Sequence, residues 1–559
     1  MYQDPDEFAL LAAQAGVPFA DRLAPGSAAF QTADVVEIHG PLDEELFGAA
    51  LTRVVVEAET LRTVVREHAG GPRQWVAPAP ADAPLHRLDL RADPAPLAAA
   101  RAWTHADLTR PGAAPNPTAG PADHAAGAPG ASGTSVAPDG RGADPAPLMT
   151  QALIRLADDH YWWYQRAHHL AADSHALHLV GRRTAEVYTA LATGQEPPRT
   201  RFAPLREVVE EESRYLNGER YAADREFWTE RLAGTEVPVT LGGPPTGGPA
   251  TVLRGHTDLP PGTFHRLAEA AATSRATWAE LVVAATALHL HRGTGARTVV
   301  LGLALANRRG PAALHTPATA VNVLPLRLAV HPQDTGAELL RRVVLEIRAV
   351  RRHQRYPHSD LRQDLGRTGA DRPLTGPVIS IKPGGTALDF ASSPGTVHHL
   401  ASGPVEDLTI GAAPGVDGRL HLSVDAHAGR YDEPAVTRHR ATLGHLLAAY
   451  ADLLLTDPQR PVGTLDLLPR DEVWAVTRGR AEAPARRTLP AALTDRVART
   501  PDAIAVRAVD ATLTFAELES AASGLGAELA RLGGEHGQPT PAPLPVGWAP
   551  PPAAPKASS

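Results

Sequence analysis

The stretch that decides the fold runs from His160 to Ser174 and reads HYWWYQRAHHLAADS. Aromatic residues such as those at 161–164 are favoured in strands, and the polar pair before His160 marks a turn, so a strand is predicted from His160 to His168. After a short turn, Asp173 or Ser174 can cap a helix. Apolar residues then recur at helical spacing until Gly194, at Leu177, Val180, Val187, Tyr188 and Leu191.

The turn between this strand and helix carries His168, His169 and Asp173. A neutral histidine has an unshifted pKa of about 6.5, so it can accept a proton near neutral pH or orient a nucleophile. Asp173 can hold a histidine tautomer or form an ion pair that fixes the turn. The spacing alone does not decide between these roles.

Two other interpretations of the turn remain open at this point. Most histidine pairs are surface or core residues without chemistry, so a structural role is one alternative. A zinc site is another, because His175 and His178 add two nitrogen ligands to the three motif residues. Zinc is disfavoured, since adjacent histidines on a strand point to opposite faces and the chain has no cysteine.

The sequence HHxxxD followed by a small residue resembles the third motif of the condensation domains of nonribosomal peptide synthetases. Six further stretches resemble the other motifs in the family's order, and the resemblance spans residues 8 to about 455. These stretches are Ala13-Gln14, Glu59–Thr63, Tyr221–Trp228, Gly302–Arg308, Val321–Arg327 and His353–Tyr356.

The sequence departs from the family pattern at several positions. Ser174 stands where the third motif has glycine, and a helix cap is the role expected for it. Glu57 and Ala58 replace the usual Arg-His of the second motif, which should affect packing more than chemistry. Val17 and Pro18 stand where the first motif commonly has leucine and tryptophan.

The pattern of strands and helices predicts an α/β or α+β fold. The resemblance implies two lobes like the chloramphenicol acetyltransferases, arranged in a V with the active site at their junction. The N-terminal lobe is expected at 1–180 and the C-terminal lobe at 181–455. Residues 111–147 contain almost no large apolar side chain and are interpreted as a disordered insertion.

Periodicity also predicts individual elements within the two lobes. The expected helices and strands are a strand at Phe30–His39, a helix at Asp43–Glu67, helices at Arg220–Leu232 and Pro260–Arg292, and strands at Thr298–Leu305 and Val323–Val330.

The chain loses periodicity at 456–485, which is interpreted as a linker. Residues 486–535 resemble the beginning of an adenylation domain, with a strand at Ile504–Val509 and a helix at Phe515–Leu532. The fragment stops before any phosphate-binding loop, so no adenylation activity is expected. A disordered tail is expected at 536–559, and we hypothesise that the reading frame is cut short or shifted near Gly537.

The resemblance implies formation of an amide bond between a carrier-bound acyl or peptidyl thioester and a carrier-bound aminoacyl group. The catalytic motif consists of His169, His168 and Asp173, with His169 acting on the amine and His168 in a structural role. Asp173 should pair with Arg308, while Asn322, Arg327 and Ser174 are expected to support the site. A noncatalytic recruitment module, or a sibling domain that epimerises or cyclises its substrate, is the alternative.

The implied partners are donor and acceptor peptidyl carrier proteins and other synthetase modules. No cofactor is expected to bind directly, because the substrates are carried on phosphopantetheine. The His353–Tyr356 stretch and the helix after Ser174 also resemble condensation domains that begin short, siderophore-type assembly lines.

Composition limits the remaining possibilities. A chain of 559 residues with 43% hydrophobic residues can bury substantial cores. A net charge of −8, with no basic block carrying interleaved aromatics, argues against nucleic-acid binding. The absence of cysteine excludes disulfides and fits a reducing compartment. The sequence shows no signal-peptide pattern and no apolar run long enough for a membrane span. A cytoplasmic location is therefore expected.

Overall fold

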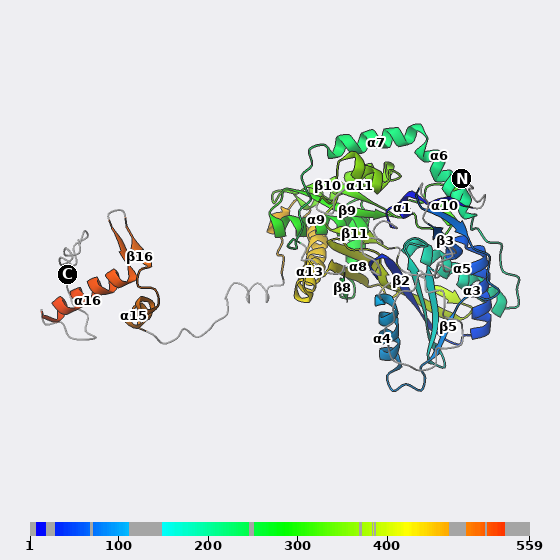
Figure 1. Cartoon of the computed structure of the whole chain (residues 1–559), viewed down its shortest axis with the longest axis horizontal. Coiled ribbons are helices and arrows are strands. Elements are labelled where there is room, and N and C mark those ends of the chain that lie inside the picture. Colours follow the sequence, from blue (N-terminus) through cyan, green and yellow to red (C-terminus); the bar gives the residue numbers. More distant parts are fainter. Residues whose placement is uncertain are drawn as a thin grey trace, which may run out of the picture. The chain divides into compact units, whose positions relative to one another are not determined.

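The structure is a computed structural model that describes residues 7–17, 28–66, 71–110, 148–244, 251–367, 372–382, 384, 387–468, 488–508 and 511–531. The chain divides into two compact units, Met1–Pro469 and Arg470–Ser559. Figure 1 shows the elements of both. The expected insertion at 111–147 and the expected tail at 536–559 lie outside the described residues.

The first unit is built on two six-stranded sheets. The first sheet has the order β12-β13-β2-β7-β6-β5, with strands Leu388–Phe390, Ser393–Ser402, Gln31–His39, His160–His168, Met149–Ala157 and His86–Asp89. The second sheet has the order β10-β9-β11-β14-β15-β8, with strands Asn322–Ala329, Thr298–Leu305, Val378–Ile381, Leu408–Pro414, Leu420–His427 and Val252–Asp258.

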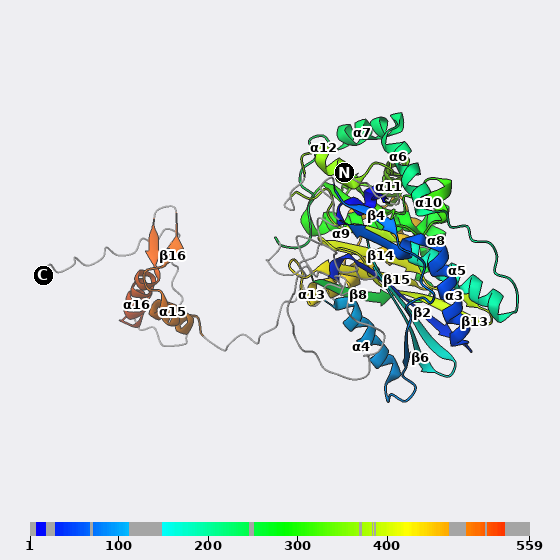
Figure 2. The same ribbon diagram turned by 45° about the vertical axis from the view of Figure 1, so that its right-hand side comes forward.

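The first sheet is covered on both faces (Figures 1 and 2). Helices α3 (Glu44–Glu57) and α5 (Ser174–Ala192) pack on one face around Phe47 and Trp163, whose rings meet edge to face. Helix α4 (Pro96–Thr109) covers part of the other face. Strand β7 is buried along almost its whole length, which explains its run of aromatic residues.

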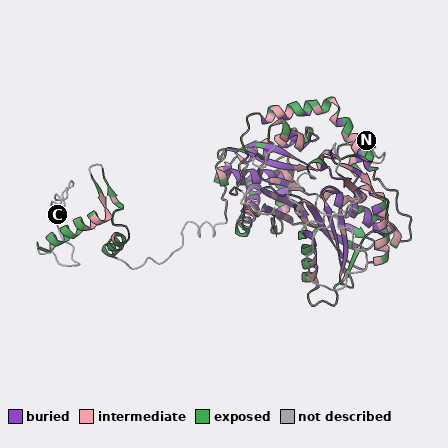
Figure 3. Ribbon diagram, in the orientation of Figure 1, coloured by how far each residue is buried: buried purple, intermediate pink, exposed green. Residues whose placement is uncertain are grey.

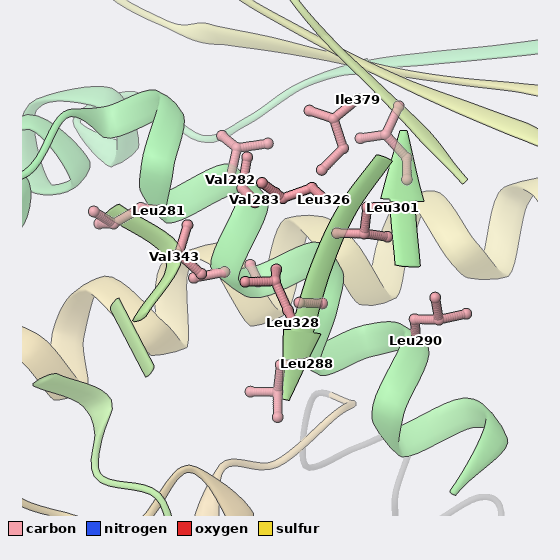
Figure 4. Close-up of a cluster of buried hydrophobic side chains, with 14 of the residues drawn as sticks. Leu281, Val282, Val283, Leu288, Leu290, Leu301, Leu326, Leu328, Val343 and Ile379 are labelled. Carbon is pink, nitrogen blue, oxygen red and sulfur yellow. The ribbon is translucent and has the colours of Figure 1, made fainter. Parts of the chain in front are cut away.

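The second sheet carries the larger hydrophobic core. Figure 4 shows side chains of α9 (Trp278–Thr294) meeting those of β9 and β10. Every residue of α9 from Leu281 to His291 is buried, as expected for a helix that is apolar on all sides. The buried residues of Figure 3 also follow α8 (Thr263–Thr273), α11 (Gly336–Arg352) and α13 (Glu433–Thr456).

Smaller elements complete the first unit. A three-stranded sheet has the order β1-β4-β3. The remaining elements of this unit are β1 Phe8–Ala9, β3 Thr63–Arg66, β4 Arg73–Val76, α1 Ala12–Ala15, α6 Leu205–Leu216, α7 Glu219–Leu232, α10 Pro311–His315, α12 His358–Asp364 and the 3₁₀ turns Ala28–Phe30, Glu59–Arg62 and Val462–Thr464.

The expected helix at Asp43–Glu67 is wrong in its second half. Helix α3 ends at Glu57, and the guanidinium of Arg62 donates to the carbonyls of Val55 and Val56 in its last turn. Basic side chains commonly satisfy the free carbonyls at helix ends in this way. The β-branched residues after Arg62 then enter strand β3.

The expected helix at Pro260–Arg292 is two helices. Arg275 adopts a left-handed conformation with φ 56°, which ends α8. Thr277 then caps α9, and its side chain and that of Glu280 form a reciprocal capping box. The sequence signal for this second start lay in the Thr277-x-x-Glu280 spacing.

Two expected boundaries also differ from the structure. A division at residue 180 falls inside α5, and β12 and β13, from much later in the chain, pair into the first sheet beside β2. The linker expected from 456 begins later, because Val462 and Leu465 are buried in the core of the second sheet. Residues 469–487 lie outside the described residues.

The second unit contains helix α15 (Leu489–Arg499), strands β16 (Ile504–Arg507) and β17 (Thr512–Thr514), and helix α16 (Phe515–Arg531). The two strands form an antiparallel pair. The predicted strand and helix are therefore confirmed to within two residues, while the likeness to an adenylation domain stays a prediction. Among the described residues of the whole chain, no helix has the length and apolar character needed to cross a bilayer.

Candidate active site at the end of strand β7

The histidine turn lies where the two large sheets meet. Strand β7 ends at His168, and the backbone N–H of His169 donates to the carbonyl of Phe30 at 2.8 Å, just before β2. From the other side, the hydroxyl of Thr319 donates to the carbonyl of His169 at 2.6 Å. Thr319 precedes β10 of the second sheet, so the backbone of His169 is held by both halves of the unit.

The ring of His169 is buried, with 8% of the residue exposed. Burial lowers its pKa, against a smaller opposing effect of Asp173 and of a hydrogen bond to the backbone of Ser402. The ring is therefore neutral near pH 7 and able to accept a proton. Its Nε2 atom has no hydrogen-bond partner among the described residues.

Gly403 covers this nitrogen. It has a φ of 92°, and a Cβ atom built on it would stand 2.2 Å from Nε2 of His169. Only glycine fits both the backbone conformation and the contact. The Nε2 atom thus lies under the connection from β13 to β14, which passes from one sheet to the other.

His168 is the last residue of β7 and lies only partly buried. Its Nδ1 accepts a hydrogen bond from the backbone N–H of Leu170 at 3.2 Å. This contact supports the tight turn and fits the structural role implied for His168, which stays a prediction.

Asp173 is the N-cap of α5 and the most heavily bonded group of the turn. Its carboxylate accepts from the backbone of Ala176 at 2.8 Å, and from Ala320 and Val321 at 3.0 and 3.1 Å. The guanidinium of Arg308 adds two bonds of 2.8 and 3.1 Å. Burial raises the pKa of Asp173, but the charge and hydrogen bonds of Arg308 and the backbone donors outweigh it and lower the pKa to about 2.

The expected pairing of Asp173 with Arg308 is therefore present in the structure, and both side chains are buried. The guanidinium also donates to the carbonyls of Ala306 and Ala318. This network joins α5, which packs on the first sheet, to the segment between β9 and β10 of the second.

The structure bears on two expectations at this site. Ser174 is not the helix cap, because Asp173 takes that position; the hydroxyl of Ser174 instead lies 3.1 Å from that of Thr32. Arg327 is exposed on β10 and lies five positions from Asn322, on the opposite face of the strand. No contact of Arg327 with the turn is among those of the described residues, so its supporting role stays a prediction.

Asn322 lies close to the motif that begins at His353. Its amide donates to the carbonyls of Gln354 and Tyr356 at 2.9 and 2.7 Å and accepts from the backbone of His358 at 3.2 Å. Gln14, from the first motif, donates to the carbonyl of Leu170 at 2.6 Å inside the histidine turn. The first motif, 156 residues earlier in the chain, is thus bonded to the turn.

Sequence reasoning missed the residues on the β13 side of the site. Lys382 is buried, and its ammonium donates to the hydroxyl of Ser402 at 2.7 Å. Nearby, Nδ1 of His399 and a carboxylate oxygen of Asp34 are 2.7 Å apart. Nothing in the local sequence pattern connects these residues with the histidine turn.

Among the described residues, the side chains of the histidine turn do not form a group close enough to share a metal ion. In the part of the chain that the structure describes, the group of three ligand side chains close enough to share an ion is Glu37, His39 and His160, at the other end of β2 and β7.

The model of the condensation domain family matches residues 5–111 and 143–475, which include both large sheets and the histidine turn. The chain belongs to the condensation domain family. The expectation of a condensation enzyme of nonribosomal peptide synthesis is confirmed at this level, as is the mixed α/β fold.

Relatives and solved structures agree with this assignment. The chain is 33% identical to a dimodular nonribosomal peptide synthase of Bacillus subtilis (strain 168), covering 94% of this chain and 21% of that protein. It is 36% identical to an isonitrile lipopeptide synthase of Streptomyces coeruleorubidus, covering 94% of this chain and 33% of that protein. The chain thus spans about a fifth to a third of the length of these two relatives.

Two solved structures cover the condensation part. The starter condensation domain of rhizomide synthetase is 30% identical with a TM-score of 0.71, covering 83% of this chain and 98% of that one. The first condensation domain of the calcium-dependent antibiotic synthetase is 28% identical with a TM-score of 0.72, covering 84% and 100%. The V-shaped arrangement of two acetyltransferase-like lobes stays a prediction.

Proposed function

We propose that this chain joins an acyl or peptidyl thioester to the amine of an aminoacyl thioester, with His169 as its catalytic residue. The observation that carries the proposal is a buried, neutral imidazole whose Nε2 has no partner among the described residues. It lies beside the ion pair of Asp173 and Arg308, which fixes the turn. Unpaired buried polar atoms are rare and occur often at reactive sites.

The reaction forms one bond and breaks another. The amine nitrogen attacks the thioester carbonyl carbon, so a C–N bond forms and the C–S bond breaks, and the thiol leaves with the proton that the amine gives up. Nε2 of His169 is suited to hold that proton in transit and to orient the amine, because burial keeps the ring neutral. Proton transfer of this kind contributes about 10²- to 10⁴-fold in rate.

Asp173 does not take part in proton transfer in this proposal. Its pKa of about 2 keeps it ionised, and its oxygens are occupied by Arg308 and backbone donors. Its function is to hold the turn in place, as Arg308 does from the other sheet.

The proposal requires the β13–β14 connection to withdraw from Nε2 when substrates bind, because Gly403 covers that atom. A cavity of about 40 Å³ already reaches the neighbouring residues Thr319 and Ala320 from the side of α6.

The substrates in this proposal are carried on phosphopantetheine arms of a donor and an acceptor carrier protein, supplied in trans or by adjoining modules. Residues 486–535 would be the start of an adenylation domain. Their described part consists of helices α15 and α16 and the strand pair β16–β17. It contains no phosphate-binding loop.

The test is a single-turnover assay with both carriers loaded, followed by mass spectrometry of each carrier. An acyl-aminoacyl product on the acceptor carrier supports condensation. An unchanged acceptor beside a fully loaded donor would show a noncatalytic recruitment module, and an epimerised or cyclised product would show a sibling activity. His168→Gln serves as the control for His169→Gln, since it alters the adjacent imidazole in the same turn.

A further inference from the structure

A second group of histidines lies at the opposite end of the strands that carry the active-site turn. Glu37 and His39 are two positions apart on β2 and so share one face of the sheet. His160 is the direct cross-strand partner of His39 on β7. The three side chains therefore project from two paired strands toward the same space.

The distances within this group suit a shared ion. Nε2 of His160 lies 2.8 Å from a carboxylate oxygen of Glu37, and Nε2 of His39 lies 3.8 Å from the same oxygen. One ligand atom from each of the three side chains lies within 4.8 Å of the others. Two nitrogen ligands at ~2.0 Å from zinc in a tetrahedral site stand about 3.3 Å apart, so only small side-chain movements are needed.

The chemistry of the ligands is also in place. One carboxylate oxygen and two imidazole nitrogens are ligand types that zinc accepts. The rings of His39 and His160 are stacked with their centroids 4.4 Å apart, and the Nε2 atoms of both lie near the same oxygen of Glu37.

We propose that Glu37, His39 and His160 bind one divalent transition-metal ion, with zinc as the ion that their two nitrogens and one oxygen suit best. Three protein ligands leave a fourth position for water. His398, whose Nε2 lies 2.9 Å from the second oxygen of Glu37, orients the carboxylate from outside the ligand set.

The position of this site indicates a structural role. Strands β2 and β7 pair continuously from His39 and His160 at the metal end to Gln31 and His168 at the active-site turn. Eight residues of strand separate the two ends by about 27 Å, so an ion here would not touch the reacting groups. It would stabilise the pairing of β2 and β7, the strands that lead to the histidine turn.

A matched pair of variants tests the proposal on the untagged full-length chain, which contains 25 histidines. Zinc binding is measured by competition with a chromophoric chelator for the wild type, for the double variant His39→Gln/His160→Gln, and for His421→Gln. His421 is an exposed histidine beside a carboxylate, Asp258, on the second sheet, so it controls for nonspecific histidine–carboxylate binding.

We expect one tight site in the wild type and in His421→Gln, and at least a tenfold weaker affinity in the double variant. Zinc should raise the melting temperature of the wild type and leave that of the double variant unchanged. Cobalt should give the absorption bands of a tetrahedral ion only where the site is intact. Equal zinc affinity in the wild type and the folded double variant, or no stoichiometric binding in the wild type, would overturn the proposal.

Discussion

Asp173 and His169 stand four residues apart on the same turn, and both are buried polar groups, yet their surroundings differ completely. Both oxygens of Asp173 are bonded to Arg308 and to backbone N–H groups. Nε2 of His169 has no partner among the described residues. One short turn thus holds a group that is fixed by its contacts and a group that is left free for chemistry.

The largest effect is expected for Asp173→Ala. It leaves the guanidinium of Arg308 buried without its carboxylate, and removing one partner of a buried ion pair costs about 3–5 kcal/mol. We expect the free energy of unfolding, measured by urea denaturation, to fall by that amount and condensation to be lost with it.

Asp432→Ala is the matched control for that variant. Asp432 caps α13 through a bond to the backbone of Ala435, but the cap is exposed and carries no buried ion pair. Its loss should cost about 1 kcal/mol. Equal losses in the two variants would show that Asp173 acts only as a cap.

The next largest effect is expected for His169→Gln, which should lower the reaction rate without unfolding the protein. We expect the single-turnover rate to fall about 10²- to 10⁴-fold, because the proton-accepting nitrogen is lost. The free energy of unfolding should fall far less than in Asp173→Ala, since the imidazole is neutral and its Nε2 makes no hydrogen bond within the described residues. A wild-type rate in the folded variant would exclude His169 from the mechanism.

The same contrast explains what the sequence could and could not predict. The strand, turn and helix around His169 follow from local patterns, and the observed strand boundaries match the expected ones. The pairing of Asp173 with Arg308 came from the resemblance. Local patterns could not show that β13 joins the first sheet, because strand pairing across 357 to 370 residues leaves no periodicity in either strand.

Gly403 was missed for the same reason. Its contact with His169 joins positions that are far apart in the chain, so neither segment carries a signal of the other. The helix errors were of a different kind: the capping box at Thr277 and the β-branched run after Arg62 were readable, but the hydrophobic periodicity continued across both breaks.

Acidification should weaken the fold through its buried histidines. Burial lowers the pKa of His169, and burial is also the main cause that lowers those of His175 to about 4 and His289 to about 3. Below the unfolded value of about 6.5, the unfolded chain therefore binds more protons than the folded one. The free energy of unfolding should fall steadily from pH 7 to pH 4, as urea titrations at each pH would show, and a flat profile would contradict the burial of these rings.

Gly403→Ala tests whether the glycine that covers Nε2 of His169 controls access to the imidazole. The new methyl group would stand 2.2 Å from Nε2 of His169, in addition to about 1–2 kcal/mol of strain at a φ of 92°. Gly418→Ala carries similar strain at a φ of 74° with open space around it. We expect similar losses of stability from strain, but a large loss of single-turnover rate only in Gly403→Ala; equal rates would show that Gly403 does not control access to the imidazole.

The smallest effect is expected at Ser174, the position where the sequence departs from its family. Its hydroxyl makes one hydrogen bond to Thr32, and a bond of this kind contributes about 0.5–1.5 kcal/mol. Ser174→Ala should lose that amount, and Ser174→Gly should lose slightly more because glycine is a poorer helix former. The single-turnover rate should stay within a few-fold of wild type in both variants, because the helix is capped by Asp173 and the hydroxyl faces Thr32. A large gain in rate for Ser174→Gly alone would instead mean that the serine side chain obstructs the substrate path.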